Sequence, residues 1–463
     1  MKWGNAMENY DVVIIGAGTA GQTAAFDLAA QGMAVAVVEE SDRPGGICIL
    51  AGCQAKKYFY EMAELLARSR HLADKGVARP PQADWGAIQA HKRSFTDKVP
   101  EGTIRQFAGH GITLWQAPAA FVDEATLQVG DRHVRAGYYI IAAGARPMDL
   151  PFEGSQHLVT SNEFLDLERL PRRLVFVGGG FISFEFAHFA ARLGGPDTAV
   201  TILEAAPRPL GPFDADLVEE LCAASAADGI TIRTSVRIEA VFRKKEEFEI
   251  RFADGEILAA DLVVHGAGRV PRIEALNLAA AGITATARGI TVDGLMRTSN
   301  PRVFAAGDCA ATIQLARVAD AEAHVAATTI AAEIHSTEPP APMNYDTTPF
   351  LLFTYPQYGM VGETEEALLT AGVKYYKSQQ TRLGWPTYRR VGLKHAACKI
   401  LVDEANRIRG AHVLSDQAAG LVNAFRLAMV NDIPADELYR QHVLSPYPTR
   451  ESDLLYMLAP FAE

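Results

Sequence analysis

Short apolar runs that end in glycine-rich turns recur along the chain and predict alternating strands and helices. The first run, residues 10–15, is rich in β-branched side chains and enters the sequence GAGTAG at residues 16–21. A helical pattern over 22–31 and a second apolar run over 33–38 follow. Strand, glycine turn, helix and strand in this order predict one unit of a doubly wound α/β fold.

The same order of elements appears again from Leu174. An apolar run over 174–177 enters three successive glycines at 178–180, a helical pattern extends to Leu193, and a further apolar run covers 199–203. The two copies predict an internal repeat of one α/β unit and not a solenoid of short repeats.

The rest of the chain follows a different pattern. Two further strands are expected to end at Gly144 and Gly268, and the Pro-rich stretch 338–343 predicts a linker. Beyond it, strands such as 399–402 alternate with helices such as 421–431. We therefore expect a separate α+β domain at the C-terminal end.

Length and charge narrow the class of protein. A chain of 463 residues is too long for one hydrophobic core, so roughly two to four domains are expected. The formal net charge of -11 argues against a nucleic-acid partner. The sequence contains no apolar run long enough to span a membrane, and residues 1–9 lack the apolar stretch of a signal peptide. We expect a cytoplasmic protein without a membrane partner.

The glycine turns indicate a ligand. In such a turn the glycines allow a tight bend, close approach of a pyrophosphate and close packing of helix on strand, and the helix N-terminus faces the negative charge. Glu39 and Glu204 end the second strands, where an acid binds a ribose hydroxyl. Ser183 stands where Gly or Ala is usual in the second turn. A tight turn without a ligand is the plainer alternative, but two units in one chain favour two dinucleotides, a flavin and a nicotinamide.

Glu204 also indicates which nicotinamide is bound. An acid repels a 2′-phosphate and accepts a hydrogen bond from a 2′-hydroxyl. Ala205 and Ala206 follow it where an NADP enzyme would need Arg, and the nearby Arg208 is equally well explained as a solvated side chain. We expect NADH, with NADPH less favoured.

A cysteine pair, Cys48 and Cys53, lies in the sequence GGICILAGCQAKK at residues 45–57. Thiol–disulfide exchange needs one thiolate to attack and a second thiol to resolve the product, and a helix N-terminus helps to lower a thiol pKa. Directly after a nucleotide-binding turn, a redox pair is favoured over two buried apolar cysteines. The isolated cysteines are interpreted as structural: Cys222, Cys309 and Cys398.

With these motifs in this order, the chain resembles the flavoprotein disulfide reductases: dihydrolipoamide dehydrogenase, glutathione reductase and mercuric reductase. Their signature GGTCxxxGCxPSK has the same cysteine spacing, and their ATG, GRxP and AxGD motifs have counterparts at Ala143-Gly144, Gly268-Arg269 and Gly307-Asp308. The resemblance extends from residue 10 to about 457. It implies a homodimer of an α/β fold with two Rossmann-like domains, an FAD domain interrupted by an NAD domain, and a C-terminal α+β interface domain. The expected boundaries are 1–150 and 276–345 for the FAD and central parts, 151–275 for the NAD domain and 346–463 for the interface domain.

The resemblance also implies roles for single residues. Cys48 would meet the substrate, and Cys53 would face the flavin as the charge-transfer thiol. Lys57 and Glu185 would meet beside the flavin ring, where a cation stabilises negative charge. No metal ligand is expected. The cofactor-binding residues implied are Gly16, Ala17, Gly18, Thr19, Ala20, Gly21, Glu39, Gly46, Lys57, Ala119, Ala143, Gly144, Gly178, Gly180, Ile182, Glu204, Gly268, Arg269, Gly307 and Asp308.

Several positions depart from the family pattern. Ile47 replaces a Thr that helps to hold FAD, and Ala55-Lys56 replaces Pro-Ser. Residues 315–319, Leu-Ala-Arg-Val-Ala, replace the usual LTPVA. None of these changes forbids FAD, although each removes a familiar contact.

The most informative departure lies near the C-terminal end, where the family carries HPTxxE and its His is the acid and base beside the partner's disulfide. Tyr447 stands at the position of that His, and Ser452 stands at the position of the Glu that orients it. A tyrosine titrates at roughly pH 10, so it donates a proton but seldom acts as a base at neutral pH. Efficient dihydrolipoamide or glutathione turnover is therefore not expected. His442 could substitute, but a surface or packed His is the plainer interpretation.

We predict an FAD-dependent, NADH-driven oxidoreductase that passes electrons through Cys48 and Cys53 to a small-molecule or protein disulfide or to another electrophile. One alternative is a mercuric-reductase-like enzyme or a quinone or oxygen diaphorase, although no cysteine follows Cys398 to capture mercury. Another is a flavin-bound redox sensor or partner subunit.

Overall fold

The computed structural model describes residues 8–462 and forms two compact units, each assembled from several segments of the chain. The first unit comprises residues up to 56, 90–148 and 269–345, and the second comprises 57–89, 149–268 and 346–463. Each unit is described below by itself. The four-part division expected from the sequence stays a prediction.

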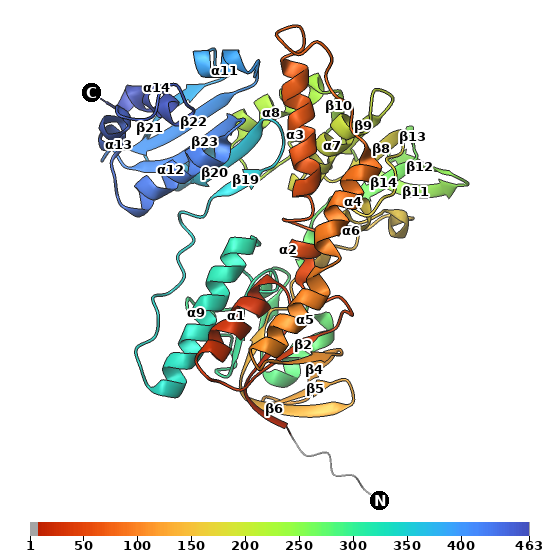
Figure 1. The fold of residues 1–463 in the computed structure, drawn as a ribbon, viewed down its shortest axis with the longest axis vertical. Helices are drawn as coiled ribbons and strands as arrows, with labels where there is room; N and C mark the ends of the chain where they lie inside the picture. Colours follow the sequence, from red (N-terminus) through yellow and green to blue (C-terminus); the bar gives the residue numbers. More distant parts are fainter. Residues whose placement is uncertain (1–7, 463) are drawn as a thin grey trace, which may run out of the picture. The chain divides into compact units, whose positions relative to one another are not determined.

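The first unit is built on a seven-stranded sheet with a parallel centre. Its first strand carries four successive side chains, Val12 to Ile15, that are at most 6% exposed, as expected for a parallel strand covered on both faces. Helices α1 (Thr19–Ala30) and α9 (Ala316–His335) pack side by side in this unit (Figure 1). The strands in sheet order are β3 (Thr113–Gln116), β2 (Val35–Glu39), β1 (Glu8–Ile15), β6 (Arg132–Ile141), β5 (Thr126–Val129) and β4 (Ala119–Phe121), with β18 (Val303–Ala305) beside β6.

Within the second unit, segment 149–268 contains a smaller α/β arrangement of the same kind. A four-stranded parallel sheet carries α7 (Phe181–Leu193) after its strand β8, and an antiparallel sheet of three strands follows in the sequence. The parallel strands in order are β10 (Ile230–Arg233), β9 (Ala199–Leu203), β8 (Arg173–Val177) and β14 (Leu262–His265), and the antiparallel strands are β11 (Ile238–Lys244), β12 (Glu247–Phe252) and β13 (Ile257–Ala260).

The C-terminal part of this unit is a five-stranded antiparallel sheet. Every residue of its strand β22 (Ala397–Asp403) is buried, because α8 (Ala215–Ala227) and α14 (Leu454–Leu458) both contact it. The sheet order is β19 (Phe350–Leu352), β20 (Gln357–Gly362), β23 (Ile408–Ser415), β22 and β21 (Tyr375–Gln380), with α12 (Ala418–Val430) against β20 and β23 and α13 (Ala435–His442) against α14.

The remaining elements connect these sheets. They are α2 (Gly46–Leu50), α3 (Lys57–His71), α4 (Trp85–Thr96), α5 (Val99–Gly109), α6 (Ser161–Phe164), α10 (Glu365–Ala371), α11 (Pro386–Arg390), β7 (Ala145–Pro147), β15 (Arg269–Pro271), β16 (Ala285–Thr286) and β17 (Gly289–Ile290).

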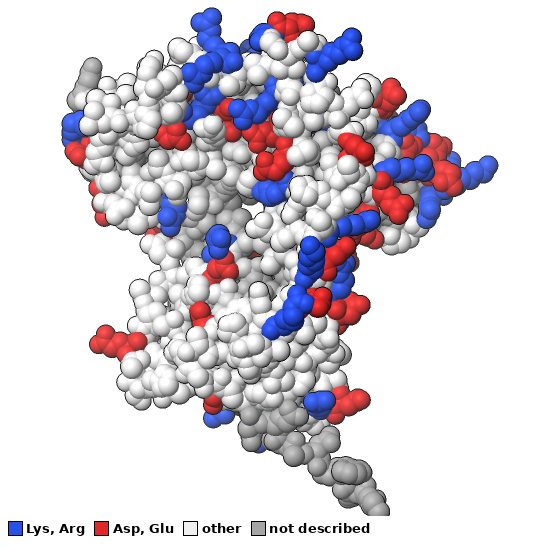
Figure 2. All heavy atoms as spheres, viewed as in Figure 1, with Lys and Arg blue, Asp and Glu red and all other residues white. Residues whose placement is uncertain are grey.

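The repeated α/β units lie where the sequence predicts them. The first helix begins at Thr19, three residues before the expected 22, because Gly18 already has the extended conformation of an N-cap. The stretch predicted as a linker, 338–343, contains no helix or strand, and Met343 N donates to Gly294 O at 2.8 Å. Over the described residues, no helix is long and apolar enough to cross a membrane. Acidic and basic side chains are intermixed on the face shown in Figure 2.

Candidate functional site

The first glycine turn joins β1 to α1 and admits no larger side chains. Gly16 has φ +112°, and a Cβ there would lie 2.3 Å from Ala142 O. A Cβ on Gly21 would lie 1.9 Å from Gly16 O, and one on Gly46 would lie 2.4 Å from Gly18 Cα. The turn therefore packs its bare backbone against β6 and against the segment that carries the cysteine pair.

Glu39 brings a carboxylate from the end of β2 to this turn. Its Oε2 accepts a hydrogen bond from Ala17 N at 2.8 Å, and its Oε1 accepts one from Ser41 N at 2.9 Å. Two backbone donors fix the carboxylate and leave lone pairs for a further donor, such as a ribose hydroxyl. The structure thus joins Glu39 to the turn, and its bond to a ribose hydroxyl stays a prediction.

The second glycine turn has the same arrangement. Gly179 N donates to Glu204 Oε2, and Ala206 N donates to Glu204 Oε1 at 2.7 Å. Gly178 has φ +96°, and a Cβ there would lie 2.4 Å from Ala267 Cα. The two acids, far apart in sequence, thus fix their turns in the same way.

The serine in the second turn is compensated by a glycine that the sequence analysis did not use. Ser183 is fully buried on the first turn of α7. A Cβ on Gly266 would lie 2.0 Å from Ser183 Oγ, so only Gly leaves room for the hydroxyl. Ile182, beside it, is half-buried on the same helical turn.

The late AxGD motif is assembled from three distant segments of the first unit. Gly307 N donates to the fully buried Glu322 at 2.7 Å. Burial raises the pKa of Asp308, and the positive charge of Arg269 opposes that rise. Arg269 lies on β15, which pairs with β7, and donates to Ala145 O directly after Gly144. Glu322 had no motif to mark it in the sequence.

These residues fit an FAD molecule. The glycines of the first turn allow the backbone segments around it to pack closely, and Glu39 is fixed beside it. Within residues 8–462 the Asp308 carboxylate makes no side-chain hydrogen bond, and its raised pKa shows that burial disfavours its charge. A bound hydroxyl would supply the missing donor. Ala119, in contrast, begins the edge strand β4, three strands from β1 in the sheet order.

The cysteine pair lies at the short helix α2 and just beyond it. The side chain of Cys53 hydrogen-bonds Cys48, and this bond, with burial, raises the pKa of the Cys48 thiol. Thr19 on α1 also hydrogen-bonds Cys48 and opposes the rise. The bond from Cys53 and burial thus dominate the pKa of Cys48, which lies on a helix of only five residues.

The other cysteines have a different environment. Burial raises the pKa of Cys222 to about 11 and the pKa values of Cys309 and Cys398 to about 12. Such thiols stay protonated near neutral pH and are poor nucleophiles.

Lys57 and Glu185 meet at a third residue in the second unit. Lys57 Nζ lies 3.2 Å from the centre of the Phe353 ring, and Phe353 N donates to Glu185 Oε1 at 3.0 Å. Glu185 is only 1% exposed. Phe353 directly follows β19, and nothing in its sequence context distinguished it.

The loop that carries Tyr447 is anchored near its end. Tyr447 is 77% exposed, whereas Ser452 is buried and its Oγ donates to Thr449 O at 2.7 Å. Ser452 thus bonds its own loop and does not orient residue 447. Arg450 is buried against the ring of Tyr388 and paired with Asp416.

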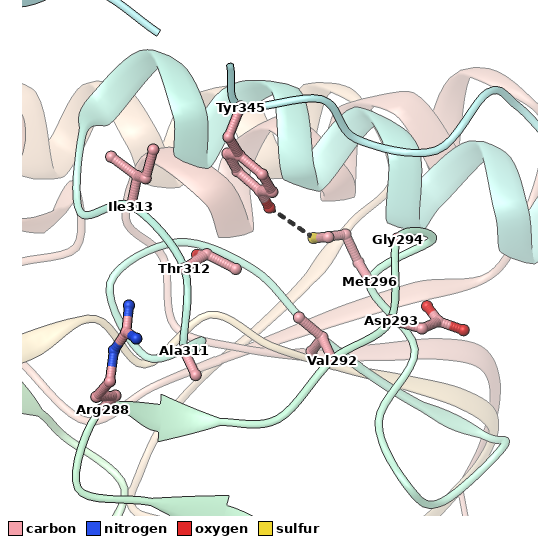
Figure 3. A pocket seen from close by; sticks show the side chains of 9 residues that line it. All are labelled: Arg288, Val292, Asp293, Gly294, Met296, Ala311, Thr312, Ile313 and Tyr345. Atoms are coloured by element: carbon pink, nitrogen blue, oxygen red, sulfur yellow. Dashed lines mark hydrogen bonds between the residues drawn. The ribbon is translucent and has the colours of Figure 1, made fainter. Parts of the chain in front are cut away.

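A cavity of about 360 Å³ lies in the first unit, and none of its lining residues is one that the sequence singled out (Figure 3). Tyr345 Oη lies 3.9 Å from Met296 Sδ at its wall and donates to Glu322 at 2.8 Å. Through Glu322 the wall is connected to Gly307. The lining residues are Arg288, Val292, Asp293, Gly294, Met296, Ala311, Thr312, Ile313 and Tyr345. No group of three or more His, Cys, Asp or Glu among the described residues could hold a metal ion.

Comparison with known protein families identifies two regions of the chain. Residues 10–323 match the model described as pyridine nucleotide-disulphide oxidoreductase, and residues 348–455 match the dimerisation domain of that family. The α/β fold class predicted from the sequence, and the resemblance on which it rested, are confirmed.

Individual relatives agree with these matches. The chain is 28% identical to dihydrolipoyl dehydrogenase of Bacillus subtilis, with 96% of each chain covered. It is 29% identical to dihydrolipoyl dehydrogenase 3 of Pseudomonas aeruginosa, with 97% of each covered. Among solved structures, the HOCl-induced flavoprotein disulfide reductase RclA from Escherichia coli superposes with a TM-score of 0.86 at 24% identity, covering 97% of this chain and 99% of that one.

Proposed function

The chain belongs to the pyridine nucleotide-disulphide oxidoreductase family, and on that premise we propose that it uses NADH to reduce a disulfide or a related electrophile through Cys48 and Cys53. It is a flavoprotein oxidoreductase, and its dimerisation domain indicates a homodimer. The observation that carries the proposal is the pair of hydrogen-bonded thiols that follows a dinucleotide-binding turn.

FAD would be held in the first unit by the first glycine turn, Glu39 and Asp308. When bound, it accepts a hydride from a nicotinamide and passes two electrons to a disulfide. The protein's own part is to fix the carboxylates and to keep the turn free of side chains, through the close approaches at Gly16, Gly21 and Gly46.

NADH is favoured over NADPH by the second turn. Glu204 is held by Gly179 N and Ala206 N, and a fixed acid at the end of this strand would repel a 2′-phosphate. The nearest cation, Arg208, donates to Phe213 O at 2.7 Å and to Gly211 O at 3.1 Å. The guanidinium of Arg208 therefore binds carbonyl oxygens of its own loop and is not available to a phosphate.

The cysteines would carry the electrons in a balanced step. NADH and the Cys48–Cys53 disulfide give NAD⁺, one thiol and one thiolate, since breaking the S–S bond leaves two electrons on the sulfurs and one proton is retained. The mutual hydrogen bond and burial disfavour ionisation of Cys48, which places the charge on Cys53. Cys48 would pass its proton to the Cys53 thiolate and attack a substrate disulfide RSSR, forming Cys48–S–SR and releasing RS⁻. RS⁻ then takes the proton from Cys53, and the Cys53 thiolate attacks the Cys48 sulfur. This restores the Cys48–Cys53 disulfide and releases the second RS⁻, so that one RSH and one RS⁻ leave.

Tyr447 replaces the acid and base of related enzymes. Its exposed hydroxyl can donate a hydrogen bond to a departing thiolate, whereas the histidine of related enzymes takes and returns a proton. We therefore assign Tyr447 the role of a hydrogen-bond donor. This role suits substrates whose reaction does not require a base. Electrophiles with a good leaving group fit this site better than dihydrolipoamide.

A comparison of two acceptors tests the proposed function. The Cys48→Ser variant should lose NADH-dependent reduction of a small disulfide such as 5,5′-dithiobis(2-nitrobenzoate) and keep NADH-dependent reduction of a quinone. Cys222→Ser is the matched control and should keep both activities. Disulfide reduction that survives Cys48→Ser would remove the cysteine pair from the electron path.

A further inference from the structure

Two polar pairs with the same sequence separation join α1 to α9. Thr23 Oγ1 donates to Asp320 Oδ1 at 3.0 Å, and one turn further His324 Nδ1 hydrogen-bonds Asp27. Both partners advance by four residues between the pairs. The two helices therefore run parallel in a fixed register along this face (Figure 1).

The same register places Asp320 close to the cysteine pair. Thr19 is four residues before Thr23, so the two side chains lie on one face of α1, about 6 Å apart along the helix. Thr19 hydrogen-bonds Cys48 and Thr23 hydrogen-bonds Asp320. The carboxylate and the thiol thus lie about one helical turn apart on the same surface.

The Asp320 carboxylate is held from two sides. Its Oδ1 is bonded to Thr23, and its Oδ2 accepts from Arg317 Nη1 at 2.9 Å. The Asp320 side chain is 21% exposed, whereas that of Arg317 is 94% exposed. Asp320 is therefore a fixed negative charge, and Arg317 is a cation in solvent that offsets part of it.

We propose that Asp320 is a positioning residue that keeps the proton of the reduced cysteine pair on Cys48, so that the negative charge falls on Cys53. The inference rests on the proposed function and adds a cause for the distribution of charge in the pair. Three groups act on the Cys48 sulfur: Cys53 and Asp320 raise its pKa, and Thr19 lowers it. Coulomb repulsion between Asp320 and a Cys48 thiolate supplies the bias.

This arrangement protects the reduced enzyme between turnovers. A Cys48 that stays protonated reacts slowly with stray electrophiles, because the thiolate is the nucleophile. Asp320 and Arg317 together would set how readily Cys48 ionises.

The test measures the reactivity of Cys48 and not turnover. The full-length FAD-bound dimer is reduced anaerobically with dithionite and treated with iodoacetamide from about pH 6 to about pH 10, and fragment-ion mass spectrometry reports the alkylation rate of Cys48 separately from that of Cys53. Asp320→Asn should move the midpoint of this profile down by about half a pH unit or more. Asp27→Asn, which removes the same charge one turn further from Cys48, should leave the profile unchanged.

A second variant covers the case in which Asp320→Asn does not fold. Arg317→Met keeps the Thr23–Asp320 bond and should move the midpoint up. Profiles that coincide with wild type for whichever of the two variants folds would overturn the inference. Because dithionite replaces NADH, this result is independent of the proposed function: a protein that NADH fails to reduce can still show the shift.

Discussion

The guanidinium of Arg450 donates to both carboxylate oxygens of Asp416, from Nε at 2.7 Å and from Nη2 at 3.1 Å. Their side chains are 5% and 1% exposed, so the pair is buried. Arg450 also lies 3.9 Å from the centre of the Tyr388 ring. This pair anchors the loop that carries Tyr447, three residues away, to the start of α12.

Breaking the pair should destabilise the second unit. Arg450→Met leaves Asp416 buried without its cation, which costs about 3 kcal/mol. The urea midpoint should fall well below that of wild type. Arg440→Met is the matched control, since Arg440 pairs with Asp436 and Glu437 in solvent, and it should leave the midpoint almost unchanged. Equal midpoints for the two variants would contradict the anchoring role.

Restoring the family's histidine at position 447 should increase the rate of dihydrolipoamide oxidation. Tyr447→His introduces a group that takes and returns a proton near neutral pH, so NADH production from dihydrolipoamide should rise about tenfold or more. Tyr447→Phe, which lacks the hydroxyl, should not rise. The plot of activity against pH should show a new titration step near neutral pH only in the Tyr447→His variant. If phenylalanine gives the same gain, the missing base is not what limits turnover.

Removing the acid of the second turn should relax the preference for NADH. Glu204→Gln removes the negative charge and keeps one acceptor oxygen, so one of the two bonds from Gly179 N and Ala206 N is retained, and Ala205→Arg adds a cation for a 2′-phosphate. The double variant should raise the ratio of kcat/KM for NADPH to that for NADH by about tenfold or more. Arg208→Met should leave the ratio unchanged. A ratio that falls with Arg208→Met would show that this arginine binds the phosphate.

Acid should weaken a buried charge cluster in the second unit. Lys399 Nζ lies 2.8 Å from Asp214 Oδ1 and 2.8 Å from Glu365 Oε2. Burial alone would raise the pKa of Glu365, but bonds from Lys377 and Lys399 outweigh it and lower the value to about 2. A carboxylate whose pKa is lower in the folded state stabilises the fold above its unfolded pKa, and this stability is lost as the pH falls from about 4.5 towards 2.

The Glu365→Gln variant tests this cluster. Its thermal midpoint should fall less than that of wild type between neutral pH and about pH 3. Glu404→Gln is the control, because Glu404 pairs with Lys374 at the surface. A steeper acid loss in Glu365→Gln than in wild type would contradict the sign of the shift.

The repeated pattern of apolar runs and glycine turns was enough to predict both parallel sheets, because side-chain periodicity and positive-φ glycines are local properties. The acids Glu39 and Glu204 were found for the same reason, since each lies at a fixed distance from its turn.

Other parts of the site could not be predicted, because they depend on contacts between distant segments. Gly266 makes room for Ser183, Phe353 joins Lys57 to Glu185, and no spacing in the sequence marks either contact. Asp320 becomes visible only when the parallel register of α1 and α9 is known. The rise in the pKa of Cys48 likewise depends on the bond from Cys53 and on burial in the folded chain.

The most direct test of the central claim is an anaerobic titration of the purified flavoprotein with NADH, followed by absorbance. The account predicts a long-wavelength charge-transfer band at two electrons per flavin, from the Cys53 thiolate beside oxidised flavin, and its absence in Cys53→Ser. Direct bleaching of the flavin in the wild-type protein, without that band, would contradict electron transfer through the cysteine pair.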